Sequence, residues 1–379
     1  MKPIAKVLSI LAGVFVVLLA ITIYIAVRAF EKFSASQQVE FPAELKAAKV
    51  TTGEEAFQKS VFYEKADLGT ITELRYGTIG ADQEPQLVVV ATNQALLLRA
   101  DGKAKKLILF PASVSRDAVV LLEPIDANHL LFLSHGSWSS PSILFDGSGN
   151  VLFTYGNWPG VNDAAAGDLN GDGKVEVAIG MNGAGGVRLL DANGNAIWSR
   201  TDGNVWHVEM LPSSGGMPGL ILHSNAGGTL VVRDHQGNVL ERKRLDTYLD
   251  DFTLTRWGGE PAATHIVAAD VDTVYVYTST GDQVASFDAP APALFNDVRA
   301  TSVRFSSGQA DFAVLRYYVR WQRSVLCINR ADRGLVYREI LADRCDSLAA
   351  MPDSGDEALL VGCHGRILRY APSPSATAR

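Results

Sequence analysis

The feature that most constrains the fold is a phrase of about 45 residues that recurs between residues 60 and 370. Each copy contains short apolar strands and a tight turn in which Gly stands with Asn or Asp, the residues that supply a positive φ. The turn glycines are Gly102, Gly149, Gly194, Gly237, Gly281 and Gly334. One sheet of this length cannot bury a face alone, so the units must pack together. The period is typical of four-stranded propeller blades.

A seventh unit begins at Asp346, but the chain ends before this unit has a fourth strand. The missing strand is expected from the other end, because residues 60–74 (SVFYEKADLGTITEL) are similar to residues 334–348 (GLVYREILADRCDSL). Closure by the N-terminal strand removes the exposed edges that an open array would leave. The predicted fold is therefore an all-β, seven-bladed β-propeller over residues 60–370, closed by its N-terminal strand.

An apolar segment precedes the repeats. Val7–Val27 holds 21 consecutive residues without a charge, enough for a helix to cross about 30 Å of hydrocarbon. The interpretation is a tail at 1–6, a transmembrane helix at 7–27, a stalk at 28–59 and, after the propeller, a disordered tail at 371–379. A signal peptide cleaved near the small residues 34–36 is the alternative, although apolar segments of signal peptides are shorter.

Charge indicates orientation and excludes one class of partner. Lys2 and Lys6 on the short side favour a cytoplasmic N-terminus and an exported propeller, periplasmic or extracellular. The absence of any Asn-X-Ser/Thr sequence favours a bacterial inner membrane. The net charge is −7 and no block of like charge occurs, which argues against a nucleic-acid partner.

One loop in the third unit has the composition of a calcium site. Asp168, Asn170, Asp172 and Glu176 place side-chain oxygens at positions 1, 3, 5 and 9, and Lys174 offers a backbone carbonyl at position 7. A strand follows the loop, so an EF-hand does not fit. The alternative is an acidic hairpin without metal; the expected cofactor is one structural calcium ion.

The calcium loop resembles the FG-GAP or VCBS repeat, the blade of integrin-alpha-type propellers, in which DxNxDGxxE-type loops bind calcium. The match covers this unit only, so an integrin-like role is not implied. The phrase LDANGNAIW around Gly194 also resembles PQQ-type blades, which leaves the propeller family open.

A ring of mainly acidic residues is predicted near the start of the first strands, which line the channel of a propeller. Its members are Glu73, Asp117, Asp163, His207, Asp251, Asp297 and Asp346. Either each carboxylate accepts backbone N–H bonds and fixes the join between blades, or the ring binds a cation or amine. Loops on the same face carry further candidates for protein or carbohydrate recognition: His135, Trp138, Trp158, Tyr318, Arg320 and Trp321.

Two functions are consistent with these observations. The first is a non-enzymatic, membrane-tethered propeller that presents a binding face outside the cytoplasm to a protein or carbohydrate partner. The second is an exported hydrolase, lyase or sulfotransferase that uses His207 or His223 with ring carboxylates. No GxSxG, HExxH or SxxK phrase occurs, which favours the first.

Three cysteines complete the set of reactive residues. Cys345 opens the first strand of the last unit and Cys363 closes the second, so a symmetric hairpin centred on Ser354 places them opposite each other. Export would permit a disulfide between them. The alternative is that each is a small buried apolar residue, as Cys327 is expected to be.

Overall fold

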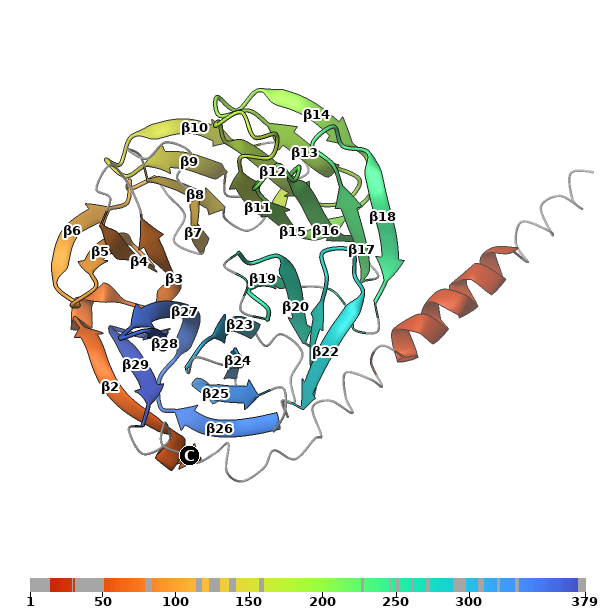
Figure 1. Cartoon of the computed structure of the whole chain (residues 1–379). Coiled ribbons are helices and arrows are strands. Elements are labelled where there is room, and N and C mark those ends of the chain that lie inside the picture. The colour runs from red at the N-terminus through yellow and green to blue at the C-terminus, as the bar shows by residue number, and fades with distance from the viewer. Residues whose placement is uncertain are drawn as a thin grey trace, which may run out of the picture.

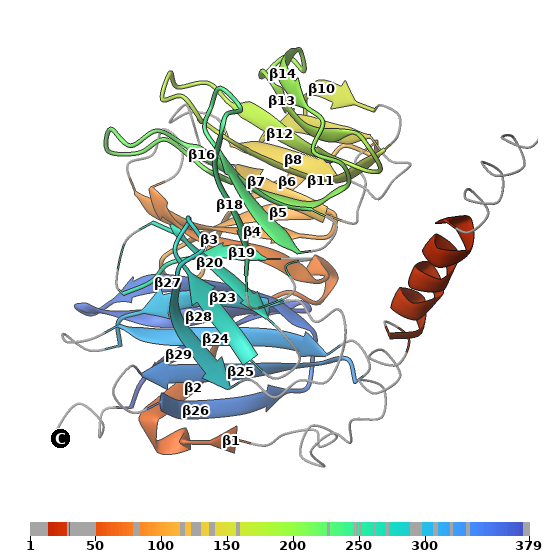
Figure 2. The same cartoon turned by 90° about the vertical axis from the view of Figure 1, so that its right-hand side faces the viewer.

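The computed structural model describes residues 14–28, 30 and 51–373, except 79–83, 114–117, 123–129, 136–140, 157–159, 226–227, 246, 248, 250–251, 259, 261, 270–272, 289–297, 306–309, 319–320 and 331–333. Its strands form seven antiparallel sheets arranged in a ring (Figure 1). Turned by 90°, the same ring shows blades that are stacked side by side (Figure 2). The predicted seven-bladed, all-β propeller is confirmed.

The first four blades each contain four consecutive strands. Blade 1 has β3 (Ile71–Thr78), β4 (Pro85–Ala91), β5 (Gln94–Arg99) and β6 (Ala104–Leu109). Blade 2 has β7 (Ala118–Leu122), β8 (Leu131–His135), β9 (Ser142–Asp146) and β10 (Val151–Tyr155). Blade 3 has β11 (Val161–Gly167), β12 (Glu176–Met181), β13 (Gly186–Leu190) and β14 (Ala196–Arg200). Blade 4 has β15 (Val205–Leu211), β16 (Leu220–Asn225), β17 (Thr229–Arg233) and β18 (Val239–Arg244).

The last three blades complete the ring. Blade 5 has β19 (Thr253–Thr255), β20 (His265–Ala269), β21 (Thr273–Tyr277) and β22 (Gln283–Asp288). Blade 6 has β23 (Val298–Val303), β24 (Asp311–Tyr318), β25 (Arg323–Arg330) and β26 (Gly334–Leu341). Blade 7 has β27 (Cys345–Asp353), β28 (Asp356–Cys363) and β29 (Arg366–Pro372), and β2 (Phe57–Glu64) is its outer strand.

The ring is closed by the N-terminal strand, as predicted. β2 pairs antiparallel with β29, so the outer strand of the last blade comes from the start of the propeller sequence. Strand pairing begins earlier than residue 60, because β1 (Thr51–Thr52) adds a fifth strand to blade 6 beside β26. The short 3-10 helix Glu54–Ala56 links β1 to β2, and a second, Ala66–Leu68, precedes β3.

Burial follows the position of a strand within its blade. Second strands are buried on both faces, as in β12, where every residue is buried, and they form apolar layers with neighbouring blades. Outer strands are mainly exposed, as in β18. The alternation expected for one buried face therefore appears at the circumference, whereas inner strands lie between two covered faces.

The apolar N-terminal segment is helical over residues 14–28. Among the residues described, no helix is long and apolar enough to cross a membrane, so the predicted span at 7–27 is not confirmed. Residues 7–13 of that span, most of the predicted stalk and residues 374–379 of the predicted tail lie outside the described residues.

Candidate functional site

Four members of the predicted ring lie within the described structure: Glu73, Asp163, His207 and Asp346. Asp117, Asp251 and Asp297 lie outside it. The four are on the inner strands β3, β11, β15 and β27, and each of these strands has a β-bulge at this point. A bulge turns a side chain away from the regular alternation of a strand. The bulges therefore help to set the direction of the side chains at this point of each strand.

The register corrects the predicted ring in blade 7. The bulged residues are Thr72, Asn162, Trp206 and Asp346, and the residue after each bulge re-enters the ladder. Glu73, Asp163 and His207 therefore correspond to Ser347, and Asp346 stands one residue earlier, on the bulge itself. The sequence pattern could not reveal this shift, because a one-residue bulge leaves the apolar alternation of the rest of the strand unchanged.

Asp163, His207 and Glu209 form a compact polar group at the inner strands of blades 3 and 4. The Asp163 Oδ2 atom lies 2.6 Å from His207 Nδ1. Because an ionised carboxylate only accepts hydrogen bonds, Nδ1 carries the proton of this bond. His207 Nε2 lies 3.7 Å from Glu209 Oε1, and the imidazole edge meets the Phe252 ring at 4.6 Å between centroids. The group thus links blades 3, 4 and 5.

Glu209 was not anticipated from the sequence, although it stands two residues after His207 and so on the same side of β15. Burial raises the pKa of Glu209, and the neighbouring His207 side chain opposes that shift, as does the charge of Arg299 in β23. A carboxylate, an imidazole and a second carboxylate in series can exchange protons.

Ring residues also bond the blades to one another. Asp163 Oδ2 accepts a 2.9 Å hydrogen bond from the backbone N–H of Val208 in the next blade. Ser347 Oγ, at the corresponding position of blade 7, donates to Ile71 O of blade 1 at 3.2 Å. Glu73 instead pairs with Arg75 at 2.8 Å, and Asp346 with Arg344 at 2.5 Å. The position thus joins neighbouring blades through Asp163, His207 and Ser347.

The predicted rim of aromatic residues is only partly described. Trp138, Trp158 and Arg320 lie outside the described residues, and His135 ends β8 with its side chain undescribed. Tyr318 is only 3% exposed and packs with Cys327, Val325 and Ile340, and the partly buried Trp321 lies against this cluster. Tyr318 therefore belongs to the interior of blade 6 and not to an exposed rim, because β24 is covered on both faces.

The predicted calcium loop connects β11 to β12. Its side-chain oxygens accept local hydrogen bonds: Asp168 from Gly171 N and Gly173 N, Asn170 from Asp172 N, Asp172 from Lys174 N, and Glu176 from Leu169 N. Burial raises the pKa of Glu176, and the charges of Asp172 and Asp168 raise it further. The donor chemistry suits calcium. Within the described part of the chain, no group of three or more His, Cys, Asp or Glu side chains that could hold a metal ion is found.

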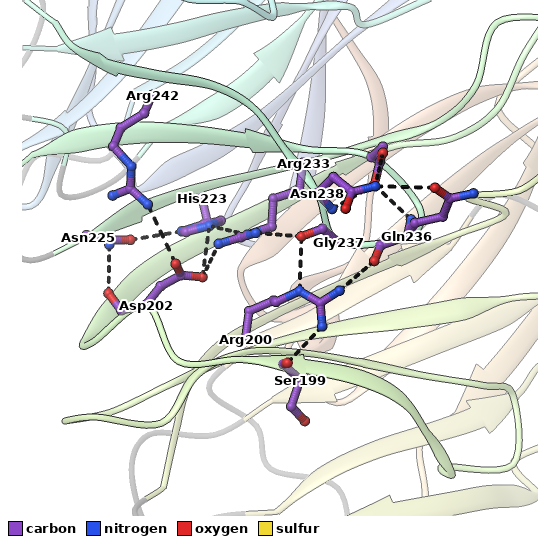
Figure 3. Close-up of polar contacts among 11 residues, drawn as sticks. Ser199, Arg200, Asp202, His223, Asn225, Arg233, Gln236, Gly237, Asn238 and Arg242 are labelled. Atoms are coloured by element: carbon purple, nitrogen blue, oxygen red, sulfur yellow. Dashed lines mark hydrogen bonds and ion pairs between the residues drawn. The ribbon is translucent and has the colours of Figure 1, made fainter.

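A polar network that was not predicted fills the contact between blades 3 and 4; we call it the 3–4 seam (Figure 3). Asp202, in the loop after β14, forms an ion pair with Arg233 of β17 and lies 3.6 Å from Arg242 of β18. Arg233 also donates to His223 Nε2 at 3.3 Å, and His223 Nδ1 lies 2.9 Å from Asn225 Oδ1. Asn225 Nδ2 donates to Asp202 O at 2.9 Å, which closes the network.

The 3–4 seam is structural at its centre and charged at its margin. His223 is fully buried, and burial together with the Arg233 charge lowers its pKa to about 4, so it is neutral at pH 7. A buried neutral imidazole with both nitrogens engaged is not accessible to a substrate, which removes His223 from the catalytic candidates. Arg242 is half exposed and carries positive charge to the surface.

The outer wall carries the same apolar position in four consecutive blades, which we call the outer band. Its members each stand three residues after a turn glycine, and their exposed fractions are 47%, 51%, 56% and 42% for Leu152, Ile197, Leu240 and Val284. They lie on β10, β14, β18 and β22, which follow one another along the circumference (Figure 1). Single exposed apolar residues are normal, but a repeated position is a surface feature. The turn glycines were a sufficient signal for finding it.

Comparison with known proteins supports the fold. No protein-family model matches the chain, and no curated protein matches it. Among solved structures, the chain is similar to BBS1N in complex with ARL6DN, soaked with mercury, at 12% identity over 86% of this chain and 95% of that chain, with a TM-score of 0.52. BamB from Moraxella catarrhalis is similar at 15% identity over 79% of this chain and 85% of that chain, with a TM-score of 0.47.

Proposed function

We propose that this chain is a non-enzymatic propeller that binds a protein partner on its outer wall. The outer band carries the proposal, because apolar side chains exposed at one position in four adjacent blades form a surface that a partner can cover. Interfaces have apolar centres with polar margins, and the charged ends of β14 and β18 supply such margins beside Ile197 and Leu240.

The rival is an exported enzyme with chemistry at His207. The Asp163–His207 pair is the observation in its favour, since a carboxylate that orients an imidazole is common in acid–base catalysis. The same Asp163 oxygen accepts the Val208 N–H, so the pair also holds blades 3 and 4 together. This double use favours a structural role, and the enzyme stays the second candidate.

We further propose that the propeller is tethered to a membrane and faces the periplasm or the extracellular space. The 21 uncharged residues Val7–Val27 support this, as do the exposed apolar side chains of its described part, such as Phe15 at 65% and Val16 at 62%. The DxNxDG loop supports an FG-GAP or VCBS-type blade and calcium binding in the third unit. For the rim, which is largely outside the described residues, we propose carbohydrate as the alternative partner class.

Photo-crosslinking in the intact cell envelope tests the proposed function. A photoreactive amino acid at Ile197 or at Leu240 in the full chain is expected to form a discrete crosslinked product with a partner protein. The same amino acid at Lys103, an exposed turn residue outside the outer band, is the control and should give none. Absence of a product from both band positions, or equal products from Lys103, would contradict protein binding at the outer band.

A further inference from the structure

The molecule already adds an extended segment to the outer edge of one blade. β1 pairs with β26 through Thr51 opposite Glu339 and Thr52 opposite Arg338, which makes blade 6 five-stranded. Within the described part of the chain, the outer strands of the other six blades are the last in their sheets. An open edge offers backbone N–H and C=O groups to a further strand.

β18 differs from the other outer edges in the side chains that it presents. Arg242 and Arg244 stand two residues apart, so they lie on one face of β18, and both are exposed. Leu240, also exposed, stands on the β-bulge just before them, between Val239, which pairs with Arg233, and Glu241, which pairs with Val232. Arg244 has no ion-pair partner among the described residues, and Arg242 reaches only one Asp202 oxygen, at 3.6 Å. β10 carries no charged residue, and β22 ends in an acid, Asp288. β6 carries Lys105 and Lys106, but as adjacent residues they point to opposite faces of the strand. In a chain of net charge −7, an edge with two exposed arginines beside a leucine selects a negative partner.

The neighbouring blade limits how far a partner strand can extend. Lys243 Nζ lies 2.6 Å from Asp282 Oδ1 in the turn of blade 5, and Gly281 of that turn packs against the Lys243 and Leu245 side chains. The C-terminal end of β18 is therefore covered on the side of blade 5. Arg242, on the opposite face, lies toward the 3–4 seam, where it is 3.6 Å from the Asp202 carboxylate that also pairs with Arg233 (Figure 3).

We propose that the outer edge of β18 binds an extended acidic segment of the partner protein, which joins blade 4 as a fifth strand. The inference rests on the proposed protein-binding function and names the chemistry of the partner. An apolar side chain of the segment lies opposite Leu240, and carboxylates lie opposite Arg242 and Arg244, since cross-strand neighbours of opposite charge stabilise a pair of strands. Backbone hydrogen bonds supply the remaining affinity.

A synthetic peptide serves as the probe. One face of the peptide carries a valine and two glutamates, the other face carries threonines, and its ends are blocked. Fluorescence anisotropy with the purified full chain should show saturable binding that weakens as salt is raised. The double variant Arg242→Glu, Arg244→Glu should weaken binding about tenfold or more, because two attractions become repulsions. The double variant Lys105→Glu, Lys106→Glu on β6 changes the net charge equally and should leave binding unchanged.

Backbone methylation separates strand addition from charge attraction alone. In a strand, alternate N–H groups point to the same neighbour, so methylating one alternate set of peptide amides should abolish binding, and methylating the other set should not. Equal binding by both methylated peptides, equal loss from the β6 and β18 variants, or no binding of the unmodified peptide would overturn the proposal. Charged residues on an edge strand can instead deter strand pairing. If that is the role of Arg242 and Arg244, the unmodified peptide should not bind.

The crosslinking experiment separates this inference from the function on which it rests. If Ile197 and Leu240 crosslink to a partner and the product survives Arg242→Glu, Arg244→Glu, the outer band binds protein but not through the β18 edge. If neither position gives a product in the unmodified chain, the proposed function itself fails. Loss of the Leu240 product in the charge-reversed chain, with circular dichroism unchanged, supports both.

Discussion

At the scale of single residues, two kinds of interaction explain why the same Asp, Asn and Gly residues recur in the turns. Asp191 Oδ1 accepts the backbone N–H groups of Asn193 and Asn195 at 2.9 and 2.8 Å, and its Oδ2 accepts Asn195 Nδ2 at 3.0 Å. Asp146 and Asp234 make the same three bonds in blades 2 and 4. The Asn195 side chain, aided by the backbone N–H groups, lowers the pKa of Asp191. Asx-type bonding thus explains why Asp and Asn flank the glycine.

The second cause is contact between blades, which the sequence could not reveal. Each turn glycine was predicted from its positive φ alone. In the structure a Cβ atom at Gly237 would meet the Trp198 ring at 3.0 Å, and one at Gly102 would meet Phe62 O of the preceding outer strand at 2.9 Å. A backbone oxygen cannot move aside as a flexible side chain can.

Replacing Gly102 by Ala is therefore expected to destabilise the propeller more than replacing Gly203. Both residues have a positive φ, +80° and +83°, so both variants carry the left-handed penalty of about 1 kcal/mol. Only Gly102 adds the contact with Phe62 O, since nothing lies within 4 Å of a Cβ at Gly203. Urea unfolding should show an additional loss of about 1 kcal/mol or more for Gly102→Ala. Equal losses would show that the turn has room to move.

At the scale of strands, periodicity predicted the blades but not their irregularities. Apolar alternation and turn glycines suffice to place strands such as β12 and β18, because burial dictates that pattern. A bulge changes the pairing by one residue without changing the residues that are apolar. That is why Asp346 was aligned with Glu73 and Asp163, whereas the ladder aligns Ser347 with them.

The same bulge determines how two cysteines meet. The β27–β28 hairpin turns between Asp353 and Asp356, so it is centred half a residue beyond Ser354. A regular ladder would then place Cys363 opposite Asp346. The bulge at Asp346 shifts the register, and Cys345 becomes the partner of Cys363, with their sulfur atoms bonded.

Mass spectrometry of the alkylated, non-reduced protein tests the disulfide. Cys345 and Cys363 should appear as a linked, unlabelled pair, and Cys327 should be alkylated only after unfolding, because it is buried. The Cys345→Ser, Cys363→Ser variant should lose about 3 kcal/mol of stability, since the bond closes a loop of 18 residues. Alkylation of all three cysteines in unfolded, non-reduced protein would exclude the bond.

The loop from Asp168 to Glu176 supports a second prediction at this scale. Burial and the charges of Asp172 and Asp168 raise the pKa of Glu176, so a cation bound among these three carboxylates would offset their repulsion. Calcium at about a hundredfold excess over its Kd should stabilise the domain by about 2.7 kcal/mol. Thermal melting with calcium and with EDTA measures the effect. Asp172→Ala should abolish it, whereas Asp282→Ala, in an exposed turn, should not.

An unchanged midpoint with calcium, magnesium and EDTA would show that Asp168, Asn170 and Asp172 act only as hydrogen-bond acceptors in the turn. In that case Asp172→Ala should still lower the melting temperature slightly, because the bond to Lys174 N is lost.

At the scale of the whole molecule, the sequence was enough to predict seven blades and their closure. Both follow from a repeat count and from a strand missing at one end and present at the other. The addition of β1 to blade 6 was not predictable, because two threonines carry no periodic signal. The 3–4 seam needs spatial neighbours from different blades, which a single repeat does not reveal.

Closure depends on a buried charged group that connects three strands. Glu339 of β26, only 2% exposed, accepts hydrogen bonds from Tyr337 at 2.8 Å, from Tyr370 of β29 at 2.7 Å and from Lys59 of β2 at 2.5 Å. Burial opposes ionisation of Glu339, but these three donors outweigh it and lower its pKa. The N-terminal strand is thereby attached to blades 6 and 7 together.

This group should make closure sensitive to acid. The folded-state pKa of Glu339 lies below the ordinary 4.5, so its contribution to stability is complete above pH 4.5 and is lost as the pH falls through the lower, folded value. Glu339→Gln should lose roughly 1.5–3 kcal/mol at pH 7, the range for hydrogen bonds to a charged group, and should show a smaller further loss in acid. Urea unfolding between pH 3 and 7 measures both effects. Lys103→Met, which breaks a pair exposed at 75% and 49%, is the control and should change neither. If Glu339→Gln keeps the acid dependence of the unmodified chain, other carboxylates control closure.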